Sequence, residues 1–572
     1  MADGLPARAD AAADLQALAA QGLPGLQRQL AALLRTDRAR LITALYRLDV
    51  DEAQARRWLA AAARDRDVTG AAAGLAELIV RRLDAKLRTT AAHRSRAHQD
   101  GGRTDSSEPL DKPRCNCAIV GIYGNRNAAV LAYQALYAMQ HRGDESTGIV
   151  TSDGSQTYRH VGMGEVRSVF ADQSILRGLR GSLALGHNRY STTGATLLHN
   201  AQPFLVEFKE GPTAISHNGN FTNTASLREK LVDEGAIFQT SSDTEVVLHL
   251  MARSPAPDLI GRIRDAFSRV SGAYAIAMIT RDRVIGLRDP RGWRPLCLGR
   301  KGNTHYLVSE TCALDLVGAR YVREVERGEI VVLGPDGVQS HRLEEQAPQA
   351  SCVVEYVYFA RPDSRVFDQY VDTARRRLGE TLADEHPADA DIVIAVPDTA
   401  NTAALGYSNQ SGIPYELGII RNHYVGRTFM APRQDQREFR ARVKFNTVDG
   451  LLKGRKVVVV DDSLVRGTTL RQLLMDIRKA GAAEIHVRIC SPPVISPCFY
   501  GMDFPTRGEL IASGMSVEEI RRYLRVDSLG FLSLEGMLSA CSGADVRGFC
   551  DACFTGNYPL PPAREAASAA AR

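Results

Sequence analysis

The residues whose types and spacing point most clearly to chemistry are Asp461 and Asp462, two adjacent carboxylates after the apolar run at 457–460. A loop rich in Ser, Gly and Thr, 463–469, follows them and leads into a helical apolar pattern. Successive backbone N–H groups and a helix N-terminus favour a phosphate, and paired carboxylates favour a ribose diol or a hard cation such as Mg²⁺. The alternative is an acidic strand end that only caps the next helix. The order of strand, acid pair, loop and helix favours a phosphate and magnesium site.

The elements that must position this acid pair form a βαβ unit. Such units bring the carboxyl ends of strands to the edge where open α/β sheets bind ligands. Another apolar strand, followed by a turn and a small-residue helix, is predicted over 391–407. After the acid pair, the helical spacing of Leu470, Leu473, Leu474 and Ile477 predicts a helix. Gly481 is predicted to end this helix. The alternation of Ile485, Val487 and Ile489 predicts the next strand.

Together these segments resemble the 5-phosphoribosyl 1-pyrophosphate signature of type I phosphoribosyltransferases. The resemblance implies that the loop after the acid pair binds the 5-phosphate, and that the acids hold ribose hydroxyls or metal. The residues it assigns to ribosyl pyrophosphate are Asp461, Asp462, Ser463, Arg466, Gly467, Thr468, Thr469, Tyr424 and Arg427. Those it assigns to Mg²⁺ are Thr399, Asp461 and Asp462.

An arginine-rich segment, 421–446, lies between the two strand motifs and has few apolar residues. It is either a solvated basic loop or a lid that orders over a polyanionic substrate. The lid, Tyr424 to Lys444, is the preferred interpretation because it would exclude water from the site.

A second group of polar motifs precedes this region. Each places polar side chains among glycines and hydroxyls at predicted strand ends, where function is common. By residue type, a cysteine beside a strand start is a candidate nucleophile, and Asn218 with Gly219 a candidate oxyanion hole. Arg189 could clamp a carboxylate and Asp243 an ammonium group, although each residue singly also fits an ordinary structural role. The motifs are RCNCAIVGIYG at 114–124, HRGDESTG at 141–148, GHNRYSTTG at 186–194, SHNGNFTN at 216–223 and TSSDTE at 240–245.

The order of these motifs resembles that of class II glutamine amidotransferases. The resemblance identifies Cys117 as the nucleophile because Gly121 and Ile122 follow at the family's spacing, whereas Cys115 does not fit. The family needs this cysteine at a free N-terminus, where its own α-amino group is the general base. It also implies the glutamine-binding residues Arg142, Gly143, Arg189 and Asp243, and an oxyanion hole formed by Asn218 and the Gly219 N–H.

Three positions depart from the family's pattern: Ala118 replaces a usual glycine, and Asp144 and Ser146 replace commoner residues. In addition, 116 residues precede Cys117, and without their removal Cys117 would lack its α-amino base. Two alternatives to the complete enzyme therefore stay open. One is an ammonia-dependent transferase, and the other is a glutaminase-dead regulator that binds ribosyl pyrophosphate or nucleotides.

A class II glutaminase joined to a type I phosphoribosyltransferase resembles the amidophosphoribosyltransferase family over about Cys117 to Tyr558. The resemblance implies the first committed step of de novo purine biosynthesis: ammonia from glutamine converts 5-phosphoribosyl 1-pyrophosphate to 5-phosphoribosylamine, with release of glutamate and pyrophosphate. It also implies inhibition by purine nucleotides and a homotetramer. The expected fold class is α/β multidomain, with an N-terminal-nucleophile αββα sandwich over 117–350, an α/β domain over 351–556 and a tail over 557–572.

Four of the ten cysteines form a further candidate site. Alone, the C-x-x-C pair could be a zinc half-site or a redox pair, and single remote cysteines are usually buried apolar residues. In one branch of the family the matching positions ligate a cluster, and four thiolates suit a 4Fe-4S cluster with a structural role. These residues are Cys352, Cys498, Cys550 and Cys553, and the cysteines left as core or surface thiols are Cys297, Cys312, Cys490 and Cys541.

Composition sets broader limits on the 572-residue chain. Its length predicts three or so domains, and the Ala-, Leu- and Arg-rich residues 1–92 predict a helical extension joined by a linker at 93–116. A formal net charge of +5 gives no case for nucleic acid, and no apolar run approaches a membrane span. Asp and Glu are frequent in the first hundred residues, unlike in a transit peptide, and the scattered cysteines do not form a secreted disulfide pattern. We therefore expect a cytoplasmic protein.

Overall fold

The computed structural model describes residues 116–190, 197–421, 445–502, 504, 507–542 and 548–560, together with seven residues before them. These seven are all helical: Gln27, Leu30, Ala31, Ala72, Ala73, Leu75 and Ala76. The rest of the predicted helical extension lies outside the described residues, as do nearly all of the linker, the lid with Tyr424 and Arg427, and most of the tail. The chain divides into two compact units, 1–108 and 109–572.

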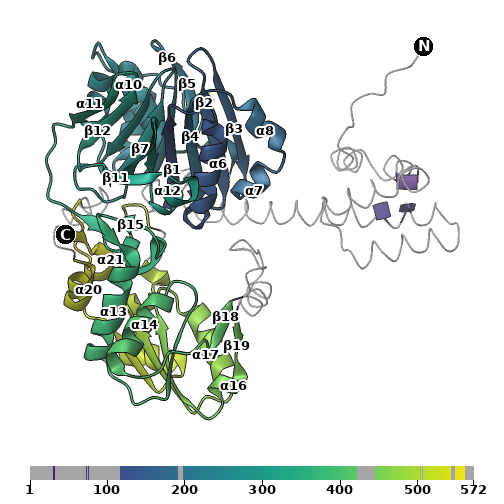
Figure 1. Cartoon of the computed structure of the whole chain (residues 1–572), viewed down its shortest axis with the longest axis vertical. Helices are drawn as coiled ribbons and strands as arrows, with labels where there is room; N and C mark the ends of the chain where they lie inside the picture. The colour runs from purple at the N-terminus through teal and green to yellow at the C-terminus, as the bar shows by residue number, and fades with distance from the viewer. Residues whose placement is uncertain are drawn as a thin grey trace, which may run out of the picture. The chain divides into compact units, whose positions relative to one another are not determined.

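Two antiparallel sheets stack face to face in the second unit, with helices on their outer faces (Figure 1). Strand β1 (Asn116–Tyr123) shows how alternation builds the layers. Val120 and Ile122 pack with α6 (Ala128–Ala138), whereas Ile119 lies in the core between the two sheets. The predicted αββα sandwich is confirmed.

The first sheet has the order β11-β9-β10-β1-β4-β2-β3 and the second the order β13-β12-β8-β7-β6-β5. The remaining strands of the first sheet are β2 (Ser146–Ser152), β3 (Thr157–Met163), β4 (Leu183–Tyr190), β9 (Cys297–Lys301), β10 (Thr304–Val308) and β11 (Arg320–Glu324). Those of the second are β5 (Phe204–Phe208), β6 (Gly211–Phe221), β7 (Gly272–Ile279), β8 (Val284–Arg288), β12 (Glu329–Gly334) and β13 (Gly337–Arg342). The helical elements around them are η1 (Gln140–Arg142), α7 (Val166–Val169), α8 (Gln173–Gly178), η2 (Leu198–Asn200), α9 (Thr224–Asp233), α10 (Thr244–Arg253), α11 (Leu259–Phe267) and α12 (Cys312–Val317).

A parallel sheet of four strands follows in the chain, with the order β17-β20-β21-β22. In β20 (Lys456–Asp461), Val458 and Val460 pack on the side of α13 and α14, and Val457 and Val459 on the side of α17. Both faces are buried, which is why this strand reads as a continuous apolar run. The other strands of this sheet are β17 (Ile392–Ala395), β21 (Glu484–Ile489) and β22 (Ser528–Phe531). The helices of this part of the chain are α13 (Val371–Glu385), α14 (Asn401–Ser411), α17 (Thr468–Lys479), α19 (Val517–Leu524) and α20 (Leu534–Cys541).

The predicted βαβ unit is confirmed in detail. The four predicted apolar positions of α17 are all buried, the helix ends two residues before Gly481, and Gly481 has φ +97°. Shorter elements complete the fold: β14 (Ser351–Cys352), the π-helical turn η3 (Glu355–Phe359), β15 (Arg365–Val366), β16 (Gln369–Tyr370), β18 (Ile419–Arg421), β19 (Phe445–Thr447), α16 (Asp449–Leu452), η4 (Arg507–Glu509), α18 (Ile511–Gly514), β23 (Phe549–Cys550) and α21 (Ala552–Thr555).

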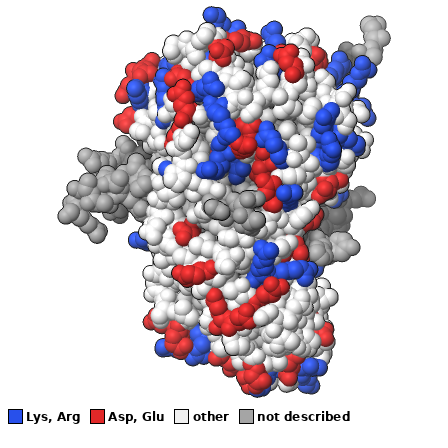
Figure 2. Space-filling view, turned by 60° about the vertical axis from the view of Figure 1, so that its left-hand side comes forward, with Lys and Arg blue, Asp and Glu red and all other residues white. Residues whose placement is uncertain are grey.

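The surface carries both charge signs. On the face shown in Figure 2, Lys and Arg are interspersed with Asp and Glu, as the small formal net charge of +5 predicts. Among the described residues, no helix is both long enough and apolar enough to cross a bilayer.

The contact between α13 and α14 provides a test of the fold. A Cβ on Gly379 would lie 1.8 Å from the carbonyl oxygen of Ala403, and one on Gly406 would lie 2.1 Å from that of Arg376. We therefore expect Gly379→Ala to push the helices apart and lower the free energy of unfolding by about 1–3 kcal/mol or more. Scanning calorimetry should show a lower midpoint for Gly379→Ala. The control Gly450→Ala, where nothing lies within 4 Å of the added Cβ, should not. Equal midpoints would contradict this packing.

Candidate functional site

The predicted nucleophile and the predicted carboxylate clamp lie on adjacent strands. Cys117 of β1 is fully buried and is the register partner of Arg189 in β4. Arg189 is 4% exposed, and its guanidinium lies 4.0 Å from the carboxylate of Glu145. Ala118, the departure next to the nucleophile, packs its methyl group in the core with α6. The sandwich therefore brings a buried thiol and a buried guanidinium together.

The predicted oxyanion hole lies on β6, and β1 packs against this strand. Asn218 is fully buried, and neither its side-chain oxygen nor its nitrogen has a hydrogen-bond partner among the described residues. Gly219 has φ +151°, and a Cβ there would lie 2.0 Å from the carbonyl oxygen of Ala273, so only glycine fits. A buried amide without a partner is costly unless a ligand completes it. This pair can donate to a developing oxyanion.

Asp243 lies at the N-cap of α10 and faces the end of β6. Its carboxylate accepts the Phe221 N–H at 3.1 Å and lies 3.4 Å from Nδ1 of His217. Burial favours a raised pKa for Asp243, but His217, the Phe221 N–H and Thr244 outweigh it, and the pKa falls below its ordinary value. Asp243 is therefore a stable carboxylate of the kind that an ammonium group requires.

Arg142 and Gly143 contact the backbone of β1 and β4 next to the nucleophile. The Arg142 guanidinium is fully buried, and its Nε donates to the carbonyl oxygen of Cys117 at 3.1 Å. A Cβ on Gly143 would lie 2.6 Å from the carbonyl carbon of Arg189, so glycine permits this close turn. The glutamine-binding role expected for Arg142 stays a prediction. The structure adds that Arg142 contacts the backbone of the nucleophile.

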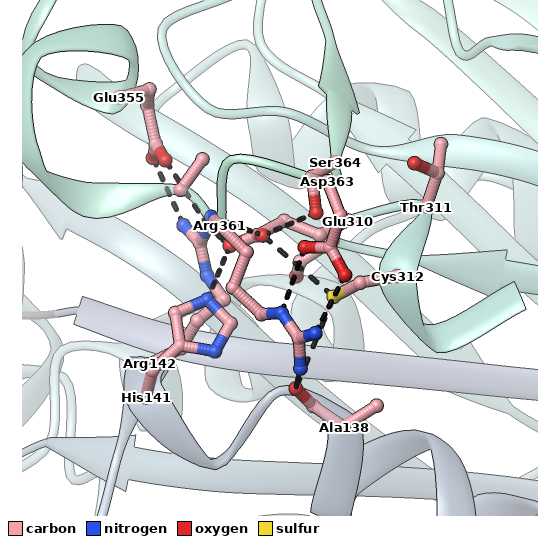
Figure 3. A network of polar contacts seen from close by, with 12 residues as sticks. Ala138, His141, Arg142, Glu310, Thr311, Cys312, Glu355, Arg361, Asp363 and Ser364 are labelled. Atoms are coloured by element: carbon pink, nitrogen blue, oxygen red, sulfur yellow. Dashed lines mark hydrogen bonds and ion pairs between the residues drawn. The ribbon is translucent and has the colours of Figure 1, made fainter. Parts of the chain in front are cut away.

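Two glutamates that sequence reasoning missed hold Arg142 in place (Figure 3). Glu355 accepts from both terminal nitrogens of Arg142, at 3.1 and 2.9 Å, and Glu310 accepts from one of them. Glu310 also bonds the ring of His141 at 2.8 Å and accepts the Arg361 N–H at 3.0 Å. Neither glutamate belongs to a sequence pattern, because the partners are 168 and 213 residues apart in the chain.

The predicted acid pair lies at the carboxyl end of β20. The hydroxyls of Thr399 and Ser463 donate to the two carboxylate oxygens of Asp462, that of Ser463 at 2.6 Å. The backbone N–H of Asp462 donates to Asp461 at 2.9 Å. Burial, and for Asp461 the neighbouring charge of Asp462, raise the pKa of both carboxyls. Thr399, predicted near the metal, is therefore adjacent to the acid pair.

The small-residue loop turns from this pair into α17. Gly467 forms the N-cap with φ +75°, and Thr468 and Thr469 are exposed in the first turn. Arg466 is exposed and pairs with Glu509 at 3.2 Å. Hydroxyls and backbone N–H groups at the start of this helix are thus accessible to an anion.

The described part of the chain contains no group of three or more His, Cys, Asp or Glu placed around a single metal ion. For Mg²⁺ this arrangement is ordinary, because proteins usually hold it with one or two carboxylates together with waters and substrate phosphates. Asp461 and Asp462 fit that mode of binding, and a bound cation would also relieve the repulsion between the partly buried Asp461 and the buried Asp462.

The four cysteines predicted as cluster ligands line one cavity. Its walls are otherwise mainly apolar: Trp293, Val354, Tyr500, Met502, Phe504 and Ala552. Cys352 and Cys550 are register partners in the short parallel pair β14 and β23, and Cys553 follows in α21. Residues that are 201 positions apart in the chain therefore converge. The four cysteines expected to be ordinary thiols, Cys297, Cys312, Cys490 and Cys541, are buried elsewhere.

Burial and a neighbouring guanidinium act in opposite directions on the pKa of these thiols. Burial raises the pKa of all four and brings that of Cys352 to about 12. The guanidinium of Arg294 opposes this for Cys352 and Cys498. The Cys498 sulfur also accepts the N–H groups of Tyr500 at 3.3 Å and Met502 at 3.4 Å. An apolar cavity with four sulfurs and N–H donors fits an iron–sulfur cluster.

Known proteins share both the sequence and the fold of this chain. Residues 187–315 match the glutamine amidotransferase domain family, and this range includes Arg189, Asn218 and Asp243. Chloroplastic amidophosphoribosyltransferase 2 of Arabidopsis thaliana is 48% identical over 463 residues, which cover 81% of this chain and 82% of that protein. The amidophosphoribosyltransferase of Bacillus subtilis (strain 168) is 45% identical over 447 residues, 77% of this chain and 94% of that protein.

Two solved structures share the fold at 45% identity. One, of the allosteric regulatory enzyme of purine biosynthesis, has a TM-score of 0.75 and covers 78% of this chain and 97% of its own. The other, of glutamine phosphoribosylpyrophosphate amidotransferase from B. subtilis complexed with ADP and GMP, has a TM-score of 0.74 and covers 78% and 98%. Similarity of this extent, across both the sandwich and the parallel sheet, shows that this chain belongs to the amidophosphoribosyltransferase family, the glycosyltransferases of the first step of purine biosynthesis.

Proposed function

We propose that the chain transfers ammonia from glutamine to 5-phosphoribosyl 1-pyrophosphate, giving 5-phosphoribosylamine, glutamate and pyrophosphate. The observation that carries the proposal is the presence of two complementary sites in one compact unit. One has a buried cysteine beside a guanidinium and an unpartnered buried amide. The other has paired carboxylates next to an accessible helix N-terminus. Family membership supports the same reaction.

In the glutaminase half-reaction, the sulfur of Cys117 attacks the side-chain amide of glutamine. Arg189 would bind the substrate carboxylate and Asp243 its ammonium group, while Asn218 and the Gly219 N–H would donate to the oxyanion. The carbon–nitrogen bond then breaks, ammonia leaves with the transferred proton, and water releases glutamate from the thioester. The base in this step is the α-amino group of Cys117, so the reaction requires removal of the preceding 116 residues.

In the transferase half-reaction, ammonia attacks C1 of the ribosyl substrate and pyrophosphate leaves. The loop at 463–469 and the first turn of α17 would bind the 5-phosphate, and Asp461 and Asp462 would orient the ribose hydroxyls. Mg²⁺, held by the acid pair near Thr399, would neutralise charge on the leaving pyrophosphate. The residues Tyr424 to Lys444 would close over the substrate and exclude water, which competes with ammonia.

We further propose a 4Fe-4S cluster with a structural role in the cavity of Cys352, Cys498, Cys550 and Cys553. A single zinc ion would need three or four ligands around one point, whereas a four-iron cluster places each thiolate on a different iron. Purine nucleotides as inhibitors, a homotetrameric assembly and a cytoplasmic location complete the proposal. The nucleotides are supported by the B. subtilis relative solved with ADP and GMP.

The processing step gives the first test. Intact mass of the purified protein identifies its N-terminal residue, and we expect glutamine-dependent activity only from chains that begin at Cys117. A chain that retains residues 1–116 should use ammonia alone, because Cys117 then has no free amino group. Glutamine-dependent turnover by the unprocessed chain would contradict this mechanism.

The nucleophile gives the second test. Cys117→Ala should lower glutamine-dependent pyrophosphate release by about a thousandfold or more, whereas ammonium chloride should still support it. The matched control is Cys297→Ala, which removes another buried thiol of the same sandwich and should change neither activity beyond about twofold. Parallel loss of both activities in Cys117→Ala would argue against separate sites.

The acid pair gives the third test. Raised pKa values mean that Asp461 and Asp462 take up protons at a higher pH than ordinary carboxyls do. The apparent KM for magnesium ribosyl pyrophosphate should therefore increase as pH falls, measured with ammonia at constant free concentration. Asp462→Asn should raise this KM about tenfold or more at neutral pH and flatten its pH dependence. The exposed control Asp449→Asn should leave both unchanged, and an unaltered profile in Asp462→Asn would refute the assignment.

A further inference from the structure

A continuous set of buried side chains joins Cys117 to the cysteine-lined cavity. It begins with Arg142, whose Nε donates to the carbonyl oxygen of Cys117 at 3.1 Å. The two terminal nitrogens of Arg142 donate to the two oxygens of Glu355 at 3.1 and 2.9 Å. This paired geometry fixes the plane of the guanidinium and, through it, the position of the Cys117 carbonyl.

The same glutamate continues the chain of contacts toward the cavity. Glu355 also accepts from Arg294 at 3.2 Å, and Arg294 donates twice to the carbonyl oxygen of Tyr500, at 3.1 and 2.6 Å. The ring of Tyr500 stacks on that of Trp293 with 4.5 Å between the ring centroids. The backbone N–H of Tyr500 donates to the sulfur of Cys498 at 3.3 Å. Glu355 itself begins η3, three residues after Cys352. Glu355 therefore contacts both Arg142 and Arg294. Through these two arginines it connects the nucleophile Cys117 to the cavity wall next to Cys498.

The charges in this set balance only when Glu355 is present. The side chains of Arg142, Arg294, Glu310 and Glu355 are all 0% exposed, and they contribute two positive and two negative charges. Water cannot replace a missing partner at this depth, so each ion must keep its counter-ion. The set therefore has one preferred arrangement, and a shift at one end changes the other.

A second contact joins the cavity wall to the oxyanion side of the same site. The side-chain nitrogen of Asn220 donates to the carbonyl oxygen of Phe499 at 3.1 Å. Asn220 lies two residues after Asn218 on β6. The segment 498–500 therefore supports two strands. It is connected to the nucleophile strand through Arg294, Glu355 and Arg142, and it contacts the strand with the oxyanion hole through Asn220.

We propose that Glu355 is a positioning residue for the glutaminase half-reaction, which aligns Cys117 by holding Arg142 against its carbonyl and joins this alignment to the wall of the cysteine-lined cavity. The inference rests on the proposed function. The guanidinium nitrogens of Arg142 bond Cys117, Glu310 and Glu355, so loss of Glu355 acts first on the nucleophile and should lower kcat for glutamine more than it raises KM. A displacement of about 1 Å at a reacting group costs about a hundredfold in rate.

The test compares Glu355→Gln with the parent enzyme, both processed to Cys117 and purified without oxygen. Gln keeps the shape of the side chain but removes its charge. We expect glutamine-dependent kcat to fall about 10- to 100-fold and ammonia-dependent kcat to change less than about twofold. Alkylation of Cys117 by iodoacetamide, followed by mass spectrometry, should slow about tenfold. This readout needs neither ribosyl pyrophosphate nor turnover.

Two further variants separate positioning from general destabilisation. Glu324→Gln is the matched control, since Glu324 is a buried glutamate of the same sandwich that pairs with Arg288 at 3.1 Å and does not contact Arg142. It should leave Cys117 alkylation unchanged. Arg294→Lys keeps the charge balance but cannot reach Glu355 and Tyr500 together, so it tests the link should Glu355→Gln not fold. It should slow alkylation and glutamine-dependent kcat at least about threefold with ammonia-dependent kcat unchanged.

The outcomes are distinct. Parent-like alkylation and glutamine turnover in folded Glu355→Gln, or in Arg294→Lys, would overturn the inference. Equal loss of both activities with unchanged alkylation would also overturn it, because it indicates a structural role only. If the processed parent shows no glutamine-dependent turnover, the proposed function fails instead.

Discussion

Two arginines and two glutamates, all withdrawn from water, hold together stretches of chain that are far apart in sequence. Arg142 follows α6, Arg294 precedes β9, Glu310 precedes α12, and Glu355 begins η3. An unpaired charge at this depth is strongly unfavourable, and loss of one partner of a buried ion pair costs about 3–5 kcal/mol, so the fold is most stable when all four meet with their hydrogen bonds formed. This requirement fixes how the segment after the sandwich returns to it. The nucleophile strand and the cavity wall are placed by the same condition.

Around this constraint, the two sites use different physical devices. The proposed glutaminase site depends on burial: a thiol, a guanidinium and an amide lie where β1, β4 and β6 pack, and a substrate would complete the Asn218 amide, which has no hydrogen-bond partner among the described residues. The proposed transferase site depends on the accessible end of a helix and on two neighbouring carboxylates whose mutual repulsion a cation or ribose hydroxyls would relieve. These devices suit the proposed ligands, a neutral amide at one site and a polyanion with its metal at the other.

Much of this could be predicted from the sequence where burial is periodic. The apolar run before Asp461 and the spacing of Leu470 to Ile477 reflect a strand buried on both faces and a helix buried on one, so the βαβ unit was predicted correctly. Glu310, Glu355 and Arg294 could not be found this way. The ion pairs that join them to one another and to Arg142 span 61 to 213 residues, and single charged residues follow no period. For Arg142, the family resemblance implied a glutamine-binding role, and only the structure showed that its guanidinium lies against the carbonyl of the nucleophile.

The parallel pair of β14 and β23 has a consequence for how the protein is made. Cys352 is opposite Cys550, and Cys553 follows, so the cavity closes only when nearly the whole chain has been synthesised. A ribosome that adds about 5–20 residues per second needs about 10–40 s to travel from Cys352 to Cys553. All strands of the sandwich, which end at Arg342, are available throughout that interval, whereas Tyr500, and with it the contact to Arg294, is added only late in it, 148 residues after Cys352. The support for Cys117 is therefore among the last parts of the molecule to assemble, and a truncated chain would carry the nucleophile without the means to align it.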